Sequence, residues 1–242
     1  ELHLAVLIET MRREGFELEV AKPQVIYKKI DGQTCEPYEE LTIDVLKEYL
    51  GTISDEIGKR KGQMITMHTV GDTGIRVMYK ISSRNLIGIR SRMLTNTRGT
   101  AVMNTYLLGY EPVGTQMESV RNGALTASQS GTTLSYGLIN AQVRGTMFYG
   151  PGVDVYEGMV VGLSSQERDI EVNVCKGKQL TNNRSSGEGV KESLEPPTIL
   201  SLEQYLDIIG DDELLEVTPQ NLRLRKRYLT MTERKIAERK QG

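Results

Sequence analysis

Tryptophan is absent from this 242-residue chain, and phenylalanine and cysteine occur only twice each. Cys35 and Cys175 lie 140 residues apart with no second thiol near either, which argues against a disulfide framework and favours a reducing, cytoplasmic compartment. No apolar run approaches the ~18 residues that a membrane helix needs, and no signal-peptide pattern opens the chain. We therefore expect a soluble cytoplasmic protein with room for one large domain or two to three small ones.

Residue patterns that carry catalysis are also lacking. The two histidines, His3 and His68, stand in no metal-binding spacing, and no Cys–His or Gly-x-Ser-x-Gly nucleophile pattern occurs. The glycine-rich stretches at 71–74 and 185–189 lack the phosphate-loop pattern and are interpreted as turns. The sequence therefore predicts no catalytic residue, no metal ligand and no bound cofactor, and this stretch of chain is not expected to be an enzyme.

The stretch from Glu39 to Tyr110 has the pattern of one compact domain. Strand-like segments occupy 39–45, 63–69, 75–81 and 100–110, and helical segments occupy 47–62 and 82–99. The second helical segment opens at Ser82, a residue type that favours helix starts, and closes at Gly99. The order βαββαβ predicts a ferredoxin-like domain, in which two helices cover one face of an antiparallel sheet.

The pattern changes after "EPVG" at 111–114. Short strand-like segments with frequent glycines, among them "TTLSYGLIN" at 132–140, predict a β-rich domain. A short helix with a capping box at Ser201 follows, and then one or two strands within 213–229 and a polar helix.

The first twenty residues indicate a different origin. An amphipathic helix with Leu4, Leu7 and Ile8 on one face leads into a strand at 16–20, and no start signal precedes the helix. This pattern predicts the last helix and strand of another α+β domain, in a chain cut from a longer protein. The predicted fold class is α+β, with domains at 1–33, 34–112 (ferredoxin-like) and 113–242 (β-rich with a short helix).

Charge is distributed unevenly along the chain. The net charge is −2, but from Glu213 onward eight basic and four acidic residues give +4, which leaves −6 for the rest. A basic end of this kind is typical of proteins that meet a polyanion, although a solvated helical tail has the same composition. Arg223, Arg225 and Arg227 alternate along a predicted strand, which directs three guanidinium groups to one face, and such groups suit phosphate.

A second cationic segment is "GKRKG" at 58–62. It places Lys59, Arg60 and Lys61 at the end of a predicted helix. Cations at this position also complement the helix dipole, so the segment has a structural explanation as well as an RNA-binding one.

The third cationic segment is "CKGKQLTNNRSSGEG" at 175–189, which follows a predicted strand and carries Lys176, Lys178 and Arg184. It is either a solvated connector or a flexible segment that binds phosphate. Together with the other basic features it favours RNA over small-molecule chemistry. A protein-interaction module without direct RNA contact, and an enzyme with an unrecognised site, remain as alternatives.

Longer stretches resemble known families. "ELHLAVLIETMRREGFELEVAKPQVIYK" resembles the end of the third domain of translational GTPases such as elongation factor G, and 39–112 is similar to their ferredoxin-like domain. "YGPGVDVYEGMVVG", "KQLTNNRSSG" and "DDELLEVTPQNLRLRKRYL" resemble the C-terminal domain special to the BipA (TypA) family. The resemblance covers essentially the whole chain.

The resemblance implies a ribosome-binding translational GTPase that acts in stress or cold adaptation and in ribosome assembly. GTP and Mg²⁺ would belong to a GTPase domain ahead of this chain, and the partners would be the bacterial ribosome, its RNA and A-site tRNA, bound by a monomer. The loop at 175–189 would approach the tRNA, so Lys176, Lys178 and Arg184 become candidates for RNA backbone contact. Their predicted hydrogen-bonding neighbours are Asn182, Asn183, Ser185 and Ser186.

Overall fold

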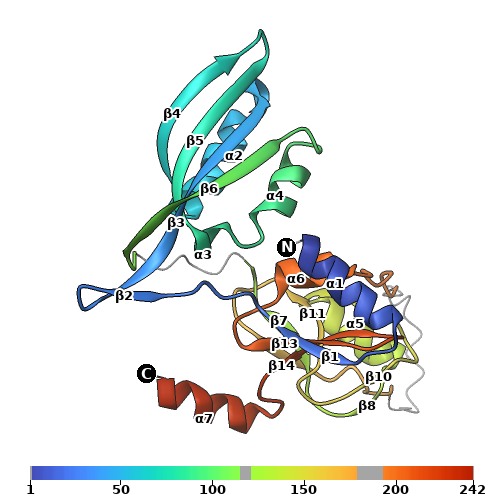
Figure 1. The fold of residues 1–242 in the computed structure, drawn as a ribbon. Coiled ribbons are helices and arrows are strands. Elements are labelled where there is room, and N and C mark those ends of the chain that lie inside the picture. Colours follow the sequence, from blue (N-terminus) through green and yellow to red (C-terminus); the bar gives the residue numbers. More distant parts are fainter. Residues whose placement is uncertain (1, 115–120, 179–192, 242) are drawn as a thin grey trace. The chain divides into compact units, whose positions relative to one another are not determined.

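The computed structural model describes residues 2–114, 121–178 and 193–241, in which seven α-helices and four open sheets form an α+β fold (Figure 1). The chain divides into two compact units. One, the ferredoxin-like unit, is Pro23–Val120, and the other, the discontinuous unit, combines Glu1–Lys22 with Arg121–Gly242. None of the described helices is both long and apolar enough to cross a bilayer.

The ferredoxin-like unit has the predicted βαββαβ order, with a short strand added in front. Its elements are β2 (Lys28–Ile30), β3 (Gln33–Leu46), a 3-10 turn (Lys47–Tyr49), α2 (Leu50–Lys59), β4 (Gln63–Val70), β5 (Gly74–Ser82), α3 (Ser83–Leu86), α4 (Ile89–Asn96) and β6 (Val102–Pro112). The sheet is antiparallel in the order β4-β5-β3-β6, and β2 forms a hairpin with the start of β3. The ferredoxin-like prediction is confirmed.

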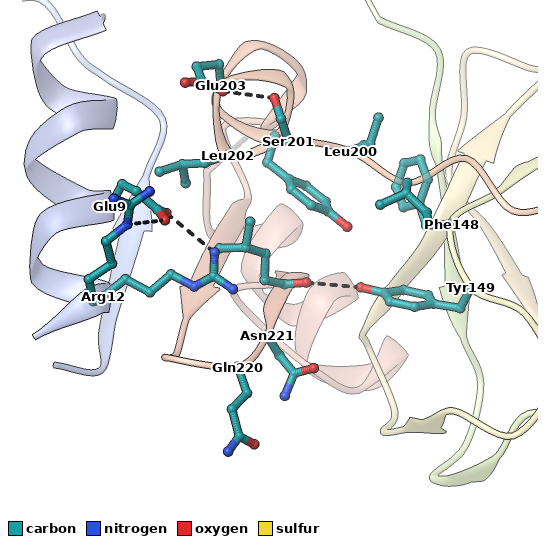
Figure 2. Close-up of a pocket in the computed structure, with 14 residues that line it drawn as sticks. Glu9, Arg12, Phe148, Tyr149, Leu200, Ser201, Leu202, Glu203, Gln220 and Asn221 are labelled. Carbon is teal, nitrogen blue, oxygen red and sulfur yellow. Dashed lines mark hydrogen bonds and ion pairs between the residues drawn. The ribbon is translucent and has the colours of Figure 1, made fainter. Parts of the chain in front are cut away.

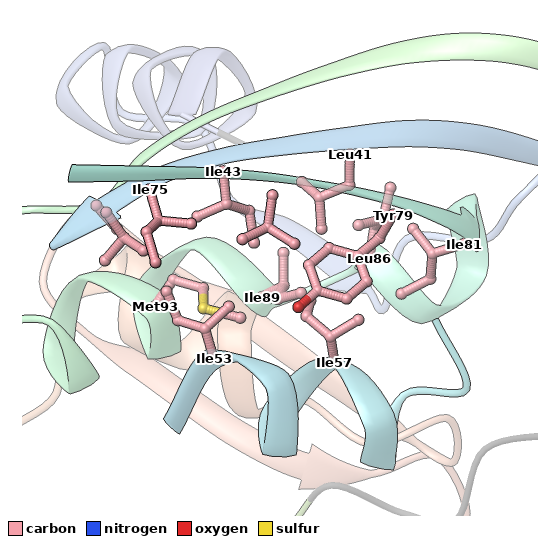
Figure 3. Packing of buried hydrophobic residues seen from close by; sticks show 13 residues of the cluster. Leu41, Ile43, Ile53, Ile57, Ile75, Tyr79, Ile81, Leu86, Ile89 and Met93 are labelled. Atoms are coloured by element: carbon pink, nitrogen blue, oxygen red, sulfur yellow. The ribbon is translucent and has the colours of Figure 1, made fainter. Parts of the chain in front are cut away.

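Alternation along the central strands explains why the helices lie on one face. Leu41 and Ile43 of β3 and Tyr79 of β5 point to the same side of the sheet, where they pack against Ile57 of α2 and Met93 of α4 (Figure 3). All five side chains are almost completely buried. Removing this apolar surface from water is the main source of stability for the unit.

The predicted helix at 82–99 is in fact two helices. Gly88 adopts a left-handed conformation (φ 71°) between α3 and α4, and the hydroxyl of Ser82 makes no capping hydrogen bond. The carbonyl groups near the break are satisfied by the buried guanidinium of Arg60, which donates to the carbonyl oxygens of Asn85 (2.8 Å) and Ile87 (2.9 Å). The break was not predicted because the residue that stabilises it, Arg60, lies just after a different helix, α2.

The discontinuous unit contains the remaining elements. These are α1 (Leu2–Arg13), β1 (Leu18–Ala21), β7 (Ala124–Ala127), β8 (Gly131–Thr132), α5 (Ser135–Gln142), β9 (Gly145–Met147), β10 (Asp154–Val155), β11 (Val160–Ser164), β12 (Ile170–Val172), α6 (Leu202–Ile208), β13 (Glu213–Val217), β14 (Leu222–Lys226) and α7 (Met231–Gln241). Three sheets have the orders β12-β7-β11-β9, β1-β13-β14 and β10-β8.

The N-terminal helix and strand are integral to this unit. β1 pairs antiparallel with β13, from Leu18 opposite Val217 to Ala21 opposite Leu214. Ala5 and Ile8 of α1 are buried in a core that also contains Tyr205, Leu215 and Leu224, whereas Leu4 and Leu7 are 38% and 56% exposed. α1 therefore buries a narrower apolar face than the sequence pattern suggests.

Two other predictions for this unit have clear outcomes. The strand predicted at 132–140 is wrong, because α5 begins at Ser135 and buries Leu138 and Ala141 at helical spacing. The capping box of α6 is confirmed: the Ser201 hydroxyl accepts from the backbone N–H of Gln204 at 3.3 Å, and the Gln204 side chain accepts from the backbone N–H of Ser201 at 2.8 Å. The predicted strands within 213–229 form the β13–β14 hairpin.

Candidate nucleic-acid interface

Lys176 and Lys178 are the described part of the predicted RNA-binding loop, and both are exposed. The chain leaves β12 through a turn in which the backbone N–H of Cys175 donates to the side-chain oxygen of Asn173 (3.1 Å). Asn182, Asn183, Arg184, Ser185 and Ser186 lie outside the described residues. We call residues 173–178 the stem.

Helix α5 supports the stem. The backbone N–H of Leu134 donates to the carbonyl oxygen of Val174 (2.9 Å), and the helix then passes directly beneath that carbonyl group at Gly137. A Cβ atom at Gly137 would lie 2.5 Å from the Val174 oxygen, closer than real Cβ contacts allow. Glycine, normally unfavourable inside a helix, is therefore required here by the close approach of a second backbone.

The other end of α5 holds the chain where the described residues resume. Gln142, the last residue of the helix, donates from Nε2 to the carbonyl oxygen of Ser193 (2.9 Å) and accepts at Oε1 from the N–H of Glu195 (3.0 Å). The two anchor points are thus at opposite ends of an eight-residue helix, which is about 12 Å long. Sequence analysis missed this role because it assigned the segment to a strand.

The segment "GKRKG" presents two exposed cations and one buried cation. Lys59 and Lys61 are exposed, but Arg60 is only 1% exposed, and its Nε donates to Glu56 at 3.0 Å. Arg60 is not at the surface, where the predicted RNA contact requires it, because its guanidinium satisfies a buried carboxylate and the carbonyl groups at the α3–α4 break. Successive residues at a helix end face different sides, so Arg60 is buried while Lys59 and Lys61 are exposed. The run of three basic residues does not by itself indicate this.

Lys61 has an unusual backbone conformation. It follows α2 with a left-handed φ of 59°, a conformation that favours glycine because other residues bring Cβ close to the backbone. The next residue, Gly62, donates its N–H to the carbonyl oxygen of Ile57 (3.0 Å) and so closes the helix end. A lysine is therefore held at a position where glycine would be less strained.

The predicted row of three arginines on one strand face holds for Arg223 and Arg225 but not for Arg227. β14 ends one residue before Arg227, and Arg225 is bound to two carboxylates, Glu216 at 2.9 Å and Glu19 on β1. The side chain of Arg225 is only 16% exposed. Arg223 is half-buried and faces Glu216 across the hairpin. Arg225 on this strand face is therefore held in ion pairs within the protein, and only Arg227 among the three is exposed.

Lys226, between those arginines, lies in a buried ion cluster. Its Nζ is 2.5 Å from Asp169, 2.9 Å from Asp212 and 3.0 Å from Glu213, and Arg121 makes a two-pronged contact with Glu213 (2.6 and 2.9 Å). Burial alone would lower the pKa of Lys226, but the surrounding carboxylates outweigh it and the pKa is raised. The cluster joins strand ends that are far apart in sequence, so sequence analysis could not identify it.

A cleft of about 550 Å³ lies between α1, α6 and the turn joining β13 to β14 (Figure 2). Its acidic and basic side chains bond to one another: Glu9 accepts from Arg12 (3.4 Å) and Arg13 (3.2 Å), and Arg12 also donates to the carbonyl oxygen of Thr218 (2.9 Å). Tyr149 also lines the cleft, and burial raises the pKa of its phenol far above the ordinary value. The bond from Arg12 to Thr218 therefore connects α1 to the turn of the β13–β14 hairpin.

The described residues contain no candidate metal site. Within the ranges that the structure describes, no three His, Cys, Asp or Glu side chains gather in a way that could hold a metal ion. Cys175 is partly buried, which raises the pKa of its thiol, so it is less reactive than an ordinary cysteine.

Comparison with known proteins matches the two halves of the chain separately. Residues 33–121 match the profile "Elongation factor G C-terminus", and residues 122–231 match "TypA/BipA C-terminal domain". A "Large ribosomal subunit assembly factor BipA" from Salmonella typhimurium is 44% identical over 242 residues, which is all of this chain and 40% of that protein. The protein of that name from Bacillus subtilis is 43% identical over 241 residues, 99% of this chain and 39% of its own length. The chain thus spans about 40% of the length of these relatives.

Proposed function

The chain belongs to the TypA/BipA family and has the sequence of its C-terminal region, and from that premise we propose that it binds ribosomal and transfer RNA. The observation that carries the proposal is the stem: Lys176 and Lys178 are both exposed on a segment that α5 holds at a fixed place. Arg184 and the polar side chains Asn182, Asn183, Ser185 and Ser186 extend the proposed contact.

A second proposed contact is the end of α2. Lys59 and Lys61 are exposed there, while buried Arg60 fixes the segment against the α3–α4 break. Lysines at such positions neutralise phosphates without reading sequence, so they add affinity and not specificity. Arg225 is not part of the proposal, because two carboxylates already bind it. Half-buried Arg223 and exposed Arg227 are peripheral candidates.

For the whole protein, the proposal follows the printed name of the relatives. Those proteins are large ribosomal subunit assembly factors, and we extend that role to this chain's parent, with a part in stress or cold adaptation. GTP and Mg²⁺ would be bound, and GTP hydrolysed, by residues outside this chain. The stem would reach toward A-site tRNA, in a monomeric protein of the cytoplasm.

The finer division of the fold is part of the same proposal. Residues 1–33 would be the end of the preceding α+β domain, 34–112 the ferredoxin-like domain and 113–242 the family's own C-terminal domain. In this reading the β1–β13 pairing is the contact through which the preceding domain joins the C-terminal one.

One observation favours a second candidate function, protein binding by the ferredoxin-like unit. β6 pairs only with β3 among the described strands, so its outer edge is open. Nine consecutive residues, 102–110, carry no charge, and Val102, Tyr106 and Leu107 are 56%, 75% and 55% exposed. Uncharged open edges of this kind accept strands of partner proteins.

Co-sedimentation with bacterial large ribosomal subunits tests the proposed function. We expect binding that weakens steeply with salt and that a Lys176→Ala, Lys178→Ala variant loses. A Lys29→Ala, Lys47→Ala variant removes two exposed lysines elsewhere and should bind like the wild type. Binding that is insensitive to salt and equal in all three proteins would favour the protein-binding alternative.

A further inference from the structure

The start of α5 contacts the stem at several points. Leu134 is bonded to Val174 through the backbone, and a Cβ atom at Gly177 would lie 3.7 Å from the Leu134 side chain. Gly137 packs against the same carbonyl group of Val174. Tyr136 therefore lies in the chain between Leu134 and Gly137, which both contact the stem.

Tyr136 is directed to solvent in this turn. Leu138 and Ala141 form the buried face of α5, and Tyr136 lies outside it with 37% of its surface exposed. The backbone of the turn is held by Asn140, whose side-chain amide donates to the carbonyl oxygen of Tyr136 (2.7 Å). The ring is thus a partly exposed aromatic surface on a fixed backbone, two residues from Leu134, whose side chain lies close to Gly177 between the two exposed lysines.

We infer that Tyr136 stacks on an unpaired base of the RNA whose phosphates Lys176 and Lys178 neutralise. This inference rests on the proposed function and adds the class of ligand, a single-stranded or unpaired nucleotide rather than a regular duplex. Proteins that bind single-stranded RNA combine cations along the backbone with aromatic rings beneath the bases.

Most other tyrosines of the same unit cannot have this role. Tyr149, Tyr156 and Tyr205 lie within the unit, and burial raises the pKa of each phenol, largely so for Tyr149 and Tyr156. Tyr228 is exposed to a similar degree, 44%, but follows β14 and lies next to no part of the stem in the contacts that the described residues make. It is therefore a matched control.

The absence of tryptophan from the chain allows a direct test. A Tyr136→Trp variant has one indole, whose fluorescence is quenched when a base stacks on it, and a Tyr228→Trp variant provides the control. The probe is a short single-stranded oligoadenylate, and its binding is followed independently by anisotropy of a label on the RNA. We expect saturable quenching for Tyr136→Trp at the concentrations at which the RNA binds, and little for Tyr228→Trp.

Affinity measurements separate the ring from the hydroxyl. Tyr136→Ala should weaken binding by roughly tenfold, because stacking on one base contributes about 1–3 kcal/mol. Tyr136→Phe should bind like the wild type, and neither change should alter the salt dependence, because no phosphate contact is lost. Thermal unfolding of each variant shows whether the fold is retained.

The outcomes distinguish failure of the stacking inference from failure of the proposed function. Salt-dependent RNA binding by the wild type, without quenching at position 136 and without an affinity loss for Tyr136→Ala, would overturn the stacking inference and leave the proposed function standing. No binding by the wild type at low salt, to oligoadenylate or to large subunits, would contradict the proposed function itself.

Discussion

Gly137 and the carbonyl oxygen of Val174 are so close that a Cβ atom on the glycine would stand 2.5 Å from the oxygen. Val174 is the second residue of the stem, and its carbonyl also accepts the N–H of Leu134. The position of Lys176 and Lys178 therefore depends on a glycine in the middle of a helix. If those lysines bind RNA, Gly137 matters for binding although it touches no RNA.

Gly137→Ala is expected to destabilise the chain by about 1–3 kcal/mol, because backbone atoms on both sides must move to accept the methyl group. RNA affinity should fall as well, because the stem is displaced. Urea unfolding and RNA titration measure the two effects. The control is Gly51→Ala in α2, where nothing lies within 4 Å of the new methyl group and stability should stay the same or rise. Equal behaviour of the two variants would show that the close approach is unimportant.

Lys61→Gly is expected to make the protein more stable and a poorer RNA binder. Glycine relieves the left-handed strain at φ 59°, a gain of about 0.5–1 kcal/mol after the lost attraction between the cation and the helix end is subtracted. Lys59→Ala is the comparison, since it removes a neighbouring exposed cation without relieving strain. Chemical denaturation and RNA affinity are the readouts. A Lys61→Gly variant that loses stability, or that binds RNA as well as the wild type, contradicts this account of the residue.

Arg60→Ala should destabilise the ferredoxin-like unit by about 3–5 kcal/mol, because buried Glu56 would keep only the more distant Arg92, at 3.8 Å, and two carbonyl groups would lose their donor. The double variant Arg60→Met, Glu56→Gln should recover part of that loss, since no buried charge remains. Urea unfolding of the three proteins measures the difference. If Arg60→Ala instead has wild-type stability and reduced RNA affinity, the arginine serves RNA and not the fold.

The Lys226 cluster predicts two pH limits to stability. Burial opposes ionisation of Asp169, but Lys226 and the N–H of Ala124 outweigh it and hold its pKa below the ordinary 3.8. A carboxyl group with a lowered pKa contributes stability above its ordinary pKa and loses it as the pH falls through the lowered value. Lys226, whose pKa is raised above 10.5, contributes stability that is present below that value and lost as the pH rises through the raised pKa.

Asp169→Asn is expected to make the loss of stability below the ordinary pKa of 3.8 more gradual, and Asp154→Asn, in β10, should leave it unchanged. Denaturant midpoints at a series of pH values provide the comparison. Identical acid profiles for the wild type and Asp169→Asn would show that the cluster does not couple to folding.

The parts of the fold that could be predicted are those with a local signal. Strand alternation in β3 and β5 and the apolar face of α2 were sufficient for the ferredoxin-like order, and Ser201 with Gln204 was sufficient for the start of α6. α5 was missed because Gly137 lowers its helix propensity, and the reason for that glycine is the Val174 carbonyl 37 residues away.

Local sequence patterns were equally insufficient to predict which cations of the candidate site are exposed. Lys59 and Lys61 are exposed as predicted, whereas Arg60 and Arg225 are bound to carboxylates that no local pattern connects to them. A run of basic residues in a sequence therefore indicates how many cations are present but not which of them remain at the surface. That distinction removes Arg60 and Arg225 from the proposed interface and leaves Lys176 and Lys178 at its centre.

The salt dependence of RNA binding tests that centre most directly. The logarithm of the binding constant is measured against the logarithm of the salt concentration for three proteins. These are the wild type, the stem variant Lys176→Ala, Lys178→Ala and the control variant Lys29→Ala, Lys47→Ala. Each lost contact to a single-stranded phosphate reduces the slope by about 0.7, so the stem variant should have a slope smaller by about 1.4, and the control should match the wild type. A stem variant with the wild-type slope and affinity would show that these two lysines do not contact RNA.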